Sequence, residues 1–395
     1  MAPKTRKILV MIPAGEVYDH DCVRWYKASD KQRSIEHYHN IGDAFVFDSS
    51  LKLLDYDQID SLEISKFDER KIDFYNAEYD FCFLRGSNYL NPSTNWSRAA
   101  DIIEKLTIPV IAFGIGAQAP SQGALELSED TKRVMRAIAD RCSTIGVRGA
   151  FTAQTLWDIG VKNIRIIGCP TLFRRNNPEL RIDLPALADV RTVGFTVRRE
   201  VSAAYAKDVE SYLDRHRAVI ADLDSRFDLR LLAQGEVEEK KLVFGTPLQR
   251  AQALVQLTQS RWFAGADDPL VRLYCTRLFY SDVVADYDCV TRLQDLVLGY
   301  RLHGNLMALA NGVPAIYFTY DSRTAEFAET FAIPAYDVFS DEPFALEAYW
   351  DQGRFERFNQ AYYRGYREMR TFLTENGLAH NMKIDAPVQE PRRAA

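Results

Sequence analysis

One short segment, Arg301-Leu302-His303-Gly304, combines an arginine, a histidine and a glycine where a strand is expected to give way to a helix. The apolar run 295–300 before it predicts a buried parallel strand, and the Ala/Leu-rich stretch 303–311 predicts a short helix that ends at Gly312. A helix N-terminus presents unpaired backbone N–H groups and the positive end of the helix dipole. With a guanidinium beside it, the segment is suited to a doubly charged anion, either a small phosphorylated acid or a nucleotide phosphate.

Two more arginines stand at the predicted ends of strands. Arg148 follows the strand expected over 144–147, and Arg198 follows the one expected over 192–197. Three arginines at the carboxyl ends of strands predict a polyanionic ligand. A buried arginine can also be half of an internal salt bridge, and Glu200 is an obvious local partner for Arg198 or Arg199. A lone histidine is likewise more often structural than catalytic, so both interpretations remain open on spacing alone.

Two glycine-containing segments are candidates for close contact with a substrate. Asn40-Ile41-Gly42-Asp43 precedes a predicted helix, so Asp43 lies in its first turn, where it could equally be a helix cap. Gly114-Ile115-Gly116-Ala117-Gln118 follows the strand expected over 109–113. It lacks the third glycine of a dinucleotide-binding loop, and no helix begins directly after it. A glycine turn that places Gln118 at the lip of a cleft is the better interpretation.

The sequence does not have the residue patterns of metal sites, disulfide frameworks, serine hydrolases or Walker-type nucleotide-binding proteins. His37 and His39 are two positions apart, which does not place them on one face of a helix, so we assign them to a solvated loop. The six cysteines are widely spaced and include no C-x-x-C pair, so neither a metal site nor a disulfide framework is predicted. The G-x-S-x-G and Walker motifs are also absent.

Strands and helices alternate along most of the chain, which predicts an α/β fold with parallel sheets covered on both faces. The pattern breaks between residues 174 and 190 and then restarts, so two doubly wound, Rossmann-like domains facing a cleft are expected. The expected divisions are residues 1–178, on the acceptor side; 190–345, on the donor or anion side; an aromatic-rich helical segment, 346–382, packed on the body; and a disordered tail, 383–395.

The composition and charge of the chain argue against some classes of binding partner. The chain has 395 residues and a formal net charge of −6, which argues against general nucleic-acid binding. The apolar run 8–13 is too short for a signal sequence, and no stretch approaches the roughly 20 apolar residues of a membrane span. A cytoplasmic protein is therefore expected, which would meet any lipid-linked substrate as a peripheral protein.

These motifs, in this order, resemble the polysaccharide pyruvyl transferase family. The resemblance rests on the Asn40–Asp43 and Gly114–Gly116 segments, the block 147–163, Gly168-Cys169-Pro170, the strand 194–198, and the run from Arg301 through Gly312-Val313-Pro314 to Asp321. It implies a fold like that of GT-B glycosyltransferases and transfer of pyruvate from phosphoenolpyruvate to a sugar as a cyclic ketal, with release of phosphate and without a metal or organic cofactor.

The resemblance also implies roles for particular residues. It assigns Arg301, His303 and, less directly, Arg198 to the donor. Protonation of the enol phosphate needs a group that titrates near neutrality, and His303 is the best-placed candidate for this acid. The further substrate-binding candidates are Arg148, Asp43, Asn40, Gly116, Gln118 and Gly304. Gly149 and Cys169 depart from the acidic residues of many members, and residues 14–39 form a longer excursion than expected. The acceptor, lipid-linked or nucleotide-linked, and the oligomeric state stay undefined. A nucleotide-sugar-dependent GT-B glycosyltransferase or epimerase and a non-catalytic anion-binding protein are the alternatives.

Overall fold

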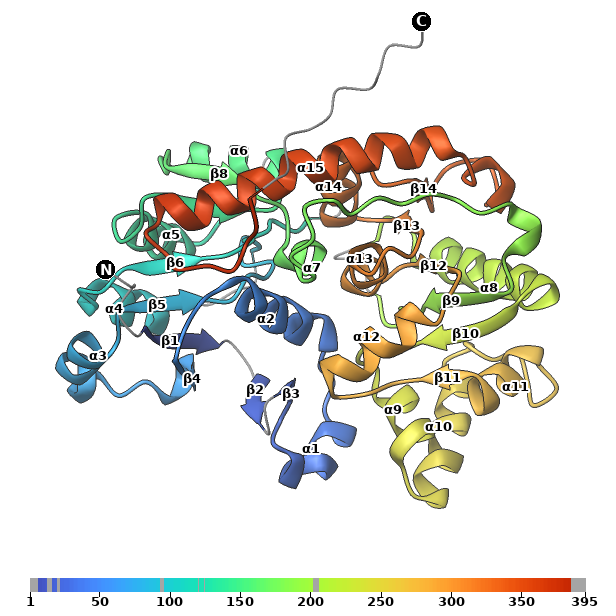
Figure 1. The fold of residues 1–395 in the computed structure, drawn as a ribbon. Helices are drawn as coiled ribbons and strands as arrows, with labels where there is room; N and C mark the ends of the chain where they lie inside the picture. The colour runs from blue at the N-terminus through green and yellow to red at the C-terminus, as the bar shows by residue number, and fades with distance from the viewer. Residues whose placement is uncertain are drawn as a thin grey trace, which may run out of the picture.

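Two parallel sheets with helices on their faces form the structure (Figure 1), a computed structural model that describes residues 6–12, 16–19, 22–92, 96–119, 121–123, 125–201 and 206–384. The predicted α/β architecture of two Rossmann-like units with a C-terminal helix packed on them is confirmed. Continuous apolar strands require cover on both faces, which the helices after each strand supply.

The first sheet has the strand order β4-β1-β5-β6, and all its strands are parallel. A bridge from Ile115 to Val147 links it to the parallel pair β7 and β8. The strands are β1 (Lys7–Ile12), β4 (Gln58–Glu63), β5 (Phe81–Leu84), β6 (Val110–Ala112), β7 (Ile145–Val147) and β8 (Ile164–Ile166). The helices are α2 (Ile41–Leu53), α3 (Ile72–Glu78), α4 (Ser97–Lys105), α5 (Glu129–Ala139), α6 (Ala150–Asp158) and α7 (Pro170–Phe173).

The excursion before the Asn40 motif contains structure of its own. An antiparallel hairpin, β2 (Glu16–Asp19) and β3 (Cys22–Trp25), is followed by α1 (Lys31–Glu36). Trp25 N donates to the backbone oxygen of Asp282, so the hairpin reaches the second half of the chain.

The second sheet has the order β11-β10-β9-β12-β13-β14, again all parallel. Its strands are β9 (Thr192–Thr196), β10 (Asp228–Leu232), β11 (Leu278–Phe279), β12 (Leu296–Gly299), β13 (Ala315–Thr319) and β14 (Ala335–Asp337). Its helices are α8 (Val209–Arg226), α9 (Val237–Phe244), α10 (Pro247–Gln259), α11 (Pro269–Thr276), α12 (Val284–Arg292), α13 (Leu302–Ala310) and α14 (Ser322–Phe331).

The long C-terminal helix α15 (Gln352–Glu375) runs across both halves at the top of Figure 1. Its aromatic stripe is buried, with Phe355, Phe358 and Phe372 fully covered, so it packs on the body as predicted. Arg165 of β8 forms an ion pair with Glu375 at 2.7 Å, which fixes the far end of the helix. The expected disordered tail falls largely on residues 385–395, outside the described part of the chain.

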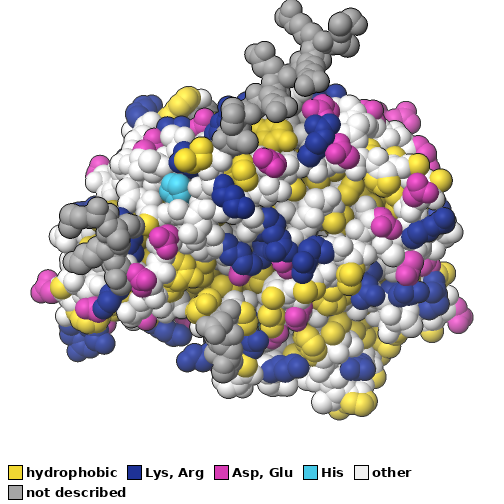
Figure 2. Space-filling view, viewed as in Figure 1, with side chains coloured by type: hydrophobic (Ala, Val, Ile, Leu, Met, Phe, Trp, Pro, Cys, Tyr) yellow, Lys and Arg dark blue, Asp and Glu magenta, His cyan; other side chains and the backbone are white. Residues whose placement is uncertain are grey.

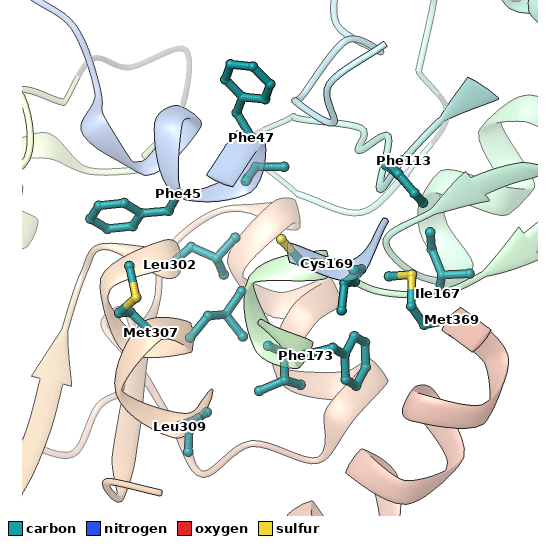
Figure 3. Packing of buried hydrophobic residues seen from close by; sticks show 14 of the residues in the cluster. Phe45, Phe47, Phe113, Ile167, Cys169, Phe173, Leu302, Met307, Leu309 and Met369 are labelled. Atoms are coloured by element: carbon teal, nitrogen blue, oxygen red, sulfur yellow. The ribbon is translucent and has the colours of Figure 1, made fainter. Parts of the chain in front are cut away.

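A single hydrophobic cluster joins the two halves. Phe45 of α2, Phe173 of α7, and Leu302 and Met307 of α13 belong to it and lie close together in Figure 3. Helix α13 therefore packs directly on α2 and α7, and this contact fixes the segment around residue 303 relative to the first half of the chain. Within the described ranges, no helix is both long and apolar enough to cross a membrane.

Candidate anion-binding site

The segments after β5, β6, β7, β9, β12 and β13 meet at the centre of the molecule, toward which the arrows of β1 and β9 point in Figure 1. Backbone contacts tie the two sides together there: Ala119 N donates to Ser322 Oγ at 2.9 Å, and Ser322 N donates to the oxygen of Ala119 at 3.1 Å. The carboxyl ends of parallel strands are the usual position of ligand sites in such folds.

His303 lies in the first turn of α13, which begins without a side-chain cap, and is buried. A Cβ placed on Gly42 would come within 2.9 Å of its Nδ1, so the imidazole packs directly on the N-terminus of α2. Its Nε2 has no hydrogen-bond partner among the described residues. Burial, and then the charges of Arg148 and Arg323, lower the pKa of His303 well below its usual value, so the imidazole is neutral in this state.

Arg148 is completely buried at the end of β7. Its Nη1 donates to Asn88, but within the described residues its Nε and Nη2 have no acceptor. The guanidinium lies 5.4 Å from the ring centre of Phe327, and burial lowers its pKa. A buried charge that lacks an anionic partner is costly, so the side chain is held ready for an anion.

Arg301 is also buried, but it has a partner. Its guanidinium forms an ion pair with Glu236, a carboxylate with no exposed surface, and its Nε donates to the oxygen of Val197 at 3.1 Å. Glu236 Oε2 has no hydrogen-bond partner in the described parts of the chain. The salt bridge that the sequence left open as an alternative is therefore present at Arg301, which leaves this arginine with less free charge than Arg148.

A chain of polar contacts joins the remaining strand ends. Arg198 and Arg323 both donate to the Tyr320 hydroxyl, at 2.5 and 2.7 Å. Arg323 lies 3.3 Å from Asp321, whose Oδ2 in turn accepts from Gln118 Nε2 at 3.2 Å. The glycine turn thus places Gln118 against the second sheet, and Gly114 adopts a φ of 65° that permits this turn.

Asp43 does not cap its helix. Asn40 does so, because its Oδ1 accepts from Gly42 N at 3.1 Å. Asp43 instead lies 3.2 Å from Arg85, a buried arginine that also pairs with Glu16. Burial raises the pKa of Glu16 to about 7 despite that pairing. Asp43 therefore partly neutralises Arg85, whose charge is one of those that lower the pKa of His303.

Gly116 and Gly304 provide close packing. A Cβ on Gly116 would lie 2.7 Å from Arg148 Cδ, and one on Gly304 would clash with the buried amide of Gln234. Every predicted site residue thus lies in this region. Sequence reasoning missed Arg85, Asn88, Gln234, Glu236, Tyr320 and Arg323. Two of them, Arg85 and Tyr320, directly follow a strand, as Arg148 does, and the others lie two to four positions after one.

The assignment of His39 to a solvated loop is wrong. Its side chain is buried, its Nε2 lies 2.7 Å from the Tyr280 hydroxyl, and burial lowers its pKa to about 3. The buried Lys240 ammonium holds the same segment by donating to the oxygen of Ser34 at 2.7 Å. His37, two positions earlier, is exposed. Glu200 lies 3.4 Å from Arg199, although Glu238 is nearer, at 2.5 Å.

Basic side chains also gather on the middle of the surface in Figure 2, over α2, α7 and α12. They are compensated by acids: Lys52 pairs with Asp48 at 2.9 Å and Arg175 with Asp288 at 2.5 Å. Beneath them, the buried Arg174 pairs with both carboxylates. In the described ranges, no group of three His, Cys, Asp or Glu side chains could hold a metal ion.

Fold and geometry together define an α/β protein with a buried, arginine-rich cluster at facing strand ends. The family model for polysaccharide pyruvyl transferase matches residues 40–322, well over half of the chain, so the chain belongs to this family. No match to a curated protein was found.

Several solved structures are similar in arrangement. A glycosyltransferase from Rickettsia africae matches at 10% identity and a TM-score of 0.46, covering 94% of this chain and 97% of that one. UDP-N-acetylglucosamine 2-epimerases from Rickettsia bellii (11%, TM-score 0.44, 94% and 97%) and Methanocaldococcus jannaschii (10%, 0.43, 90% and 90%) match comparably. At this level of likeness, their substrates say nothing about those of this chain.

Proposed function

We propose that the protein transfers pyruvate from phosphoenolpyruvate to a sugar of a polysaccharide or its precursor, forming a cyclic ketal and releasing phosphate. The observation that carries this proposal is the group around His303, in which the neutral imidazole lies within the field of several arginines and Arg148 has no anionic partner. Such a site favours a small ligand with several negative charges.

The residues suit the chemistry. The methylene carbon of the enol phosphate takes up a proton, which leaves an oxocarbenium-like C2; one sugar hydroxyl attacks, phosphate leaves, and the second hydroxyl closes the ring. Bound phosphate and carboxylate would offset the arginine charges that lower the pKa of His303. Donor binding would then protonate the imidazole and prepare it as the acid. Arg148, Arg301 and Arg198 would hold the anionic groups.

The proposal includes a division into residues 1–178 and 190–345, with the donor held between their facing strand ends, and a cytoplasmic location. No metal or organic cofactor takes part. The nucleotide-sugar alternative uses the same architecture and would require a nucleoside pocket beside the arginines.

Ligand-dependent thermal unfolding tests the donor. Phosphoenolpyruvate should raise the melting temperature by the equivalent of about 2.7 kcal/mol at a hundredfold excess over Kd, and UDP should do much less. A clear shift with UDP and none with phosphoenolpyruvate would overturn the proposal in favour of the glycosyltransferase.

A further inference from the structure

A cavity of about 460 Å³ opens beside the candidate anion site. Arg198, which reaches Tyr320 in the anion site, is also one of its walls. Pockets of roughly 300–1,000 Å³ typically enclose ligands larger than phosphoenolpyruvate. The volume therefore exceeds what the donor alone would occupy.

The lining combines two kinds of surface. Trp262, Leu213 and Val201 give it an apolar floor, while Arg199, Glu200 and Ser260 give it polar groups. Arg199 lies 3.4 Å from Glu200 and also pairs with Glu238 and Glu239, and burial raises the pKa of the Glu200 carboxyl. A sugar hydroxyl both donates and accepts hydrogen bonds, so neighbouring hydroxyls can bind a guanidinium and a carboxylate side by side.

Tyr38 closes the cavity from the first half of the chain and keeps about 48% of its surface exposed. It lies in the segment that Lys240 holds through the backbone oxygens of Ser34 and His37, which gives the ring a fixed support. The Tyr38 side chain also hydrogen-bonds Arg301, so what it offers a sugar is the apolar face of its ring, which suits the C–H face of the sugar.

We infer that this cavity is the acceptor subsite and that it takes an uncharged hexose unit or disaccharide end of the acceptor. The inference rests on the proposed function. It moves most acceptor contacts to residues 198–262, with Tyr38 contributed by the first half, whereas the sequence placed the acceptor on residues 1–178. A sugar held here lies next to Arg198 and so presents its hydroxyls toward the donor.

The test fills the cavity and leaves the anion site intact. Ser260 is exposed at the end of α10, so Ser260→Trp adds a large ring at the cavity wall with little risk to folding. Thr258→Trp adds the same ring to the same helix, outside the lining, and is the matched control. Thermal shifts are measured on the full chain with phosphoenolpyruvate, with UDP, and with a panel of free hexoses and their disaccharides at millimolar concentration.

We expect at least one saccharide to stabilise both the wild type and the Thr258→Trp variant. Ser260→Trp should lower the affinity for that saccharide at least tenfold and leave phosphoenolpyruvate binding unchanged. Tyr38→Ala should weaken the same saccharide, whereas Phe74→Ala, which removes another half-exposed ring, should not. Saccharide binding that is equal in all variants, or no saccharide binding to the wild type, overturns the acceptor subsite alone.

The outcomes separate the two proposals. If phosphoenolpyruvate does not raise the melting temperature of the wild type, the proposed function is overturned, whatever the cavity binds. UDP binding that Ser260→Trp abolishes would make the cavity a nucleoside pocket and would overturn both.

Discussion

Replacing Arg148 by methionine should stabilise the unliganded protein and weaken donor binding at the same time. The reason is the unusual environment of this guanidinium, which is fully buried with two of its three nitrogens lacking acceptors among the described residues. Methionine keeps an unbranched apolar side chain in the same space and removes the charge. Function and stability therefore make opposite demands on this position.

The two magnitudes follow from the contacts. An anion that fills both vacant nitrogens gains two charge-assisted hydrogen bonds of about 1.5–3 kcal/mol each, so Arg148→Met should raise the donor Kd by roughly two to four powers of ten. Replacing a buried charge by an apolar group of similar size gains about 1–4 kcal/mol. Losing the hydrogen bond to Asn88 costs about 1 kcal/mol, so a net gain of up to about 3 kcal/mol in unfolding free energy is expected.

Denaturant unfolding and calorimetric titration with phosphoenolpyruvate measure both quantities. Arg174→Met is the matched control, because Arg174 is equally buried but is paired with Asp48 and Asp288. Its loss removes one ion pair from each carboxylate, which then keep only Lys52 and Arg175 as partners, and should destabilise the protein.

If Arg148→Met unfolds as easily as Arg174→Met, the guanidinium is satisfied in the unliganded protein and the reasoning fails. Unchanged donor affinity in a folded Arg148→Met protein would remove this residue from the anion site.

Three further outcomes follow from the same contacts. Arg301→Ala should weaken donor binding by about 2–4 kcal/mol, and it should also destabilise the fold because it leaves the buried Glu236 without its ion-pair partner. Arg301→Met combined with Glu236→Gln should recover stability in denaturant unfolding but should not recover the calorimetric affinity for the donor. Recovery of both quantities would exclude Arg301 as a donor-binding residue. The pKa of His303 is lowered in the unliganded protein, and a bound anion should raise it, so donor binding should be coupled to uptake of a proton. Donor affinity should therefore increase as the pH falls below the pKa of His303 in the complex, by up to tenfold per pH unit. A His303→Gln protein with the same pH dependence of affinity would show that His303 takes up no proton. Transfer measured by phosphate release should be unchanged by EDTA, and loss of activity restored by one divalent ion would contradict an arginine-only site.

Many of the strands and helices, and the chain positions of the candidate ligand-binding residues, could be predicted from the amino-acid sequence. Apolar runs followed by Ala/Leu-rich stretches gave the strands β9 and β12 and the helix α13, since periodicity and helix ends depend on neighbouring residues. Placing arginines after strands also predicted their convergence, because parallel strands present their carboxyl ends at one edge. His303, Arg148, Arg198 and Gln118 accordingly lie around one centre.

Which of these arginines has a carboxylate partner depends on the tertiary structure. Arg301 and Arg148 look alike in sequence, each between a strand and a helix, but Glu236, 65 residues from Arg301, neutralises one of them and no described acid pairs with the other. His39 likewise became a core residue through Tyr280, 241 positions away. Such pairings depend on chain segments that meet only after the sheets and helices have packed, and sequence spacing does not encode that distance.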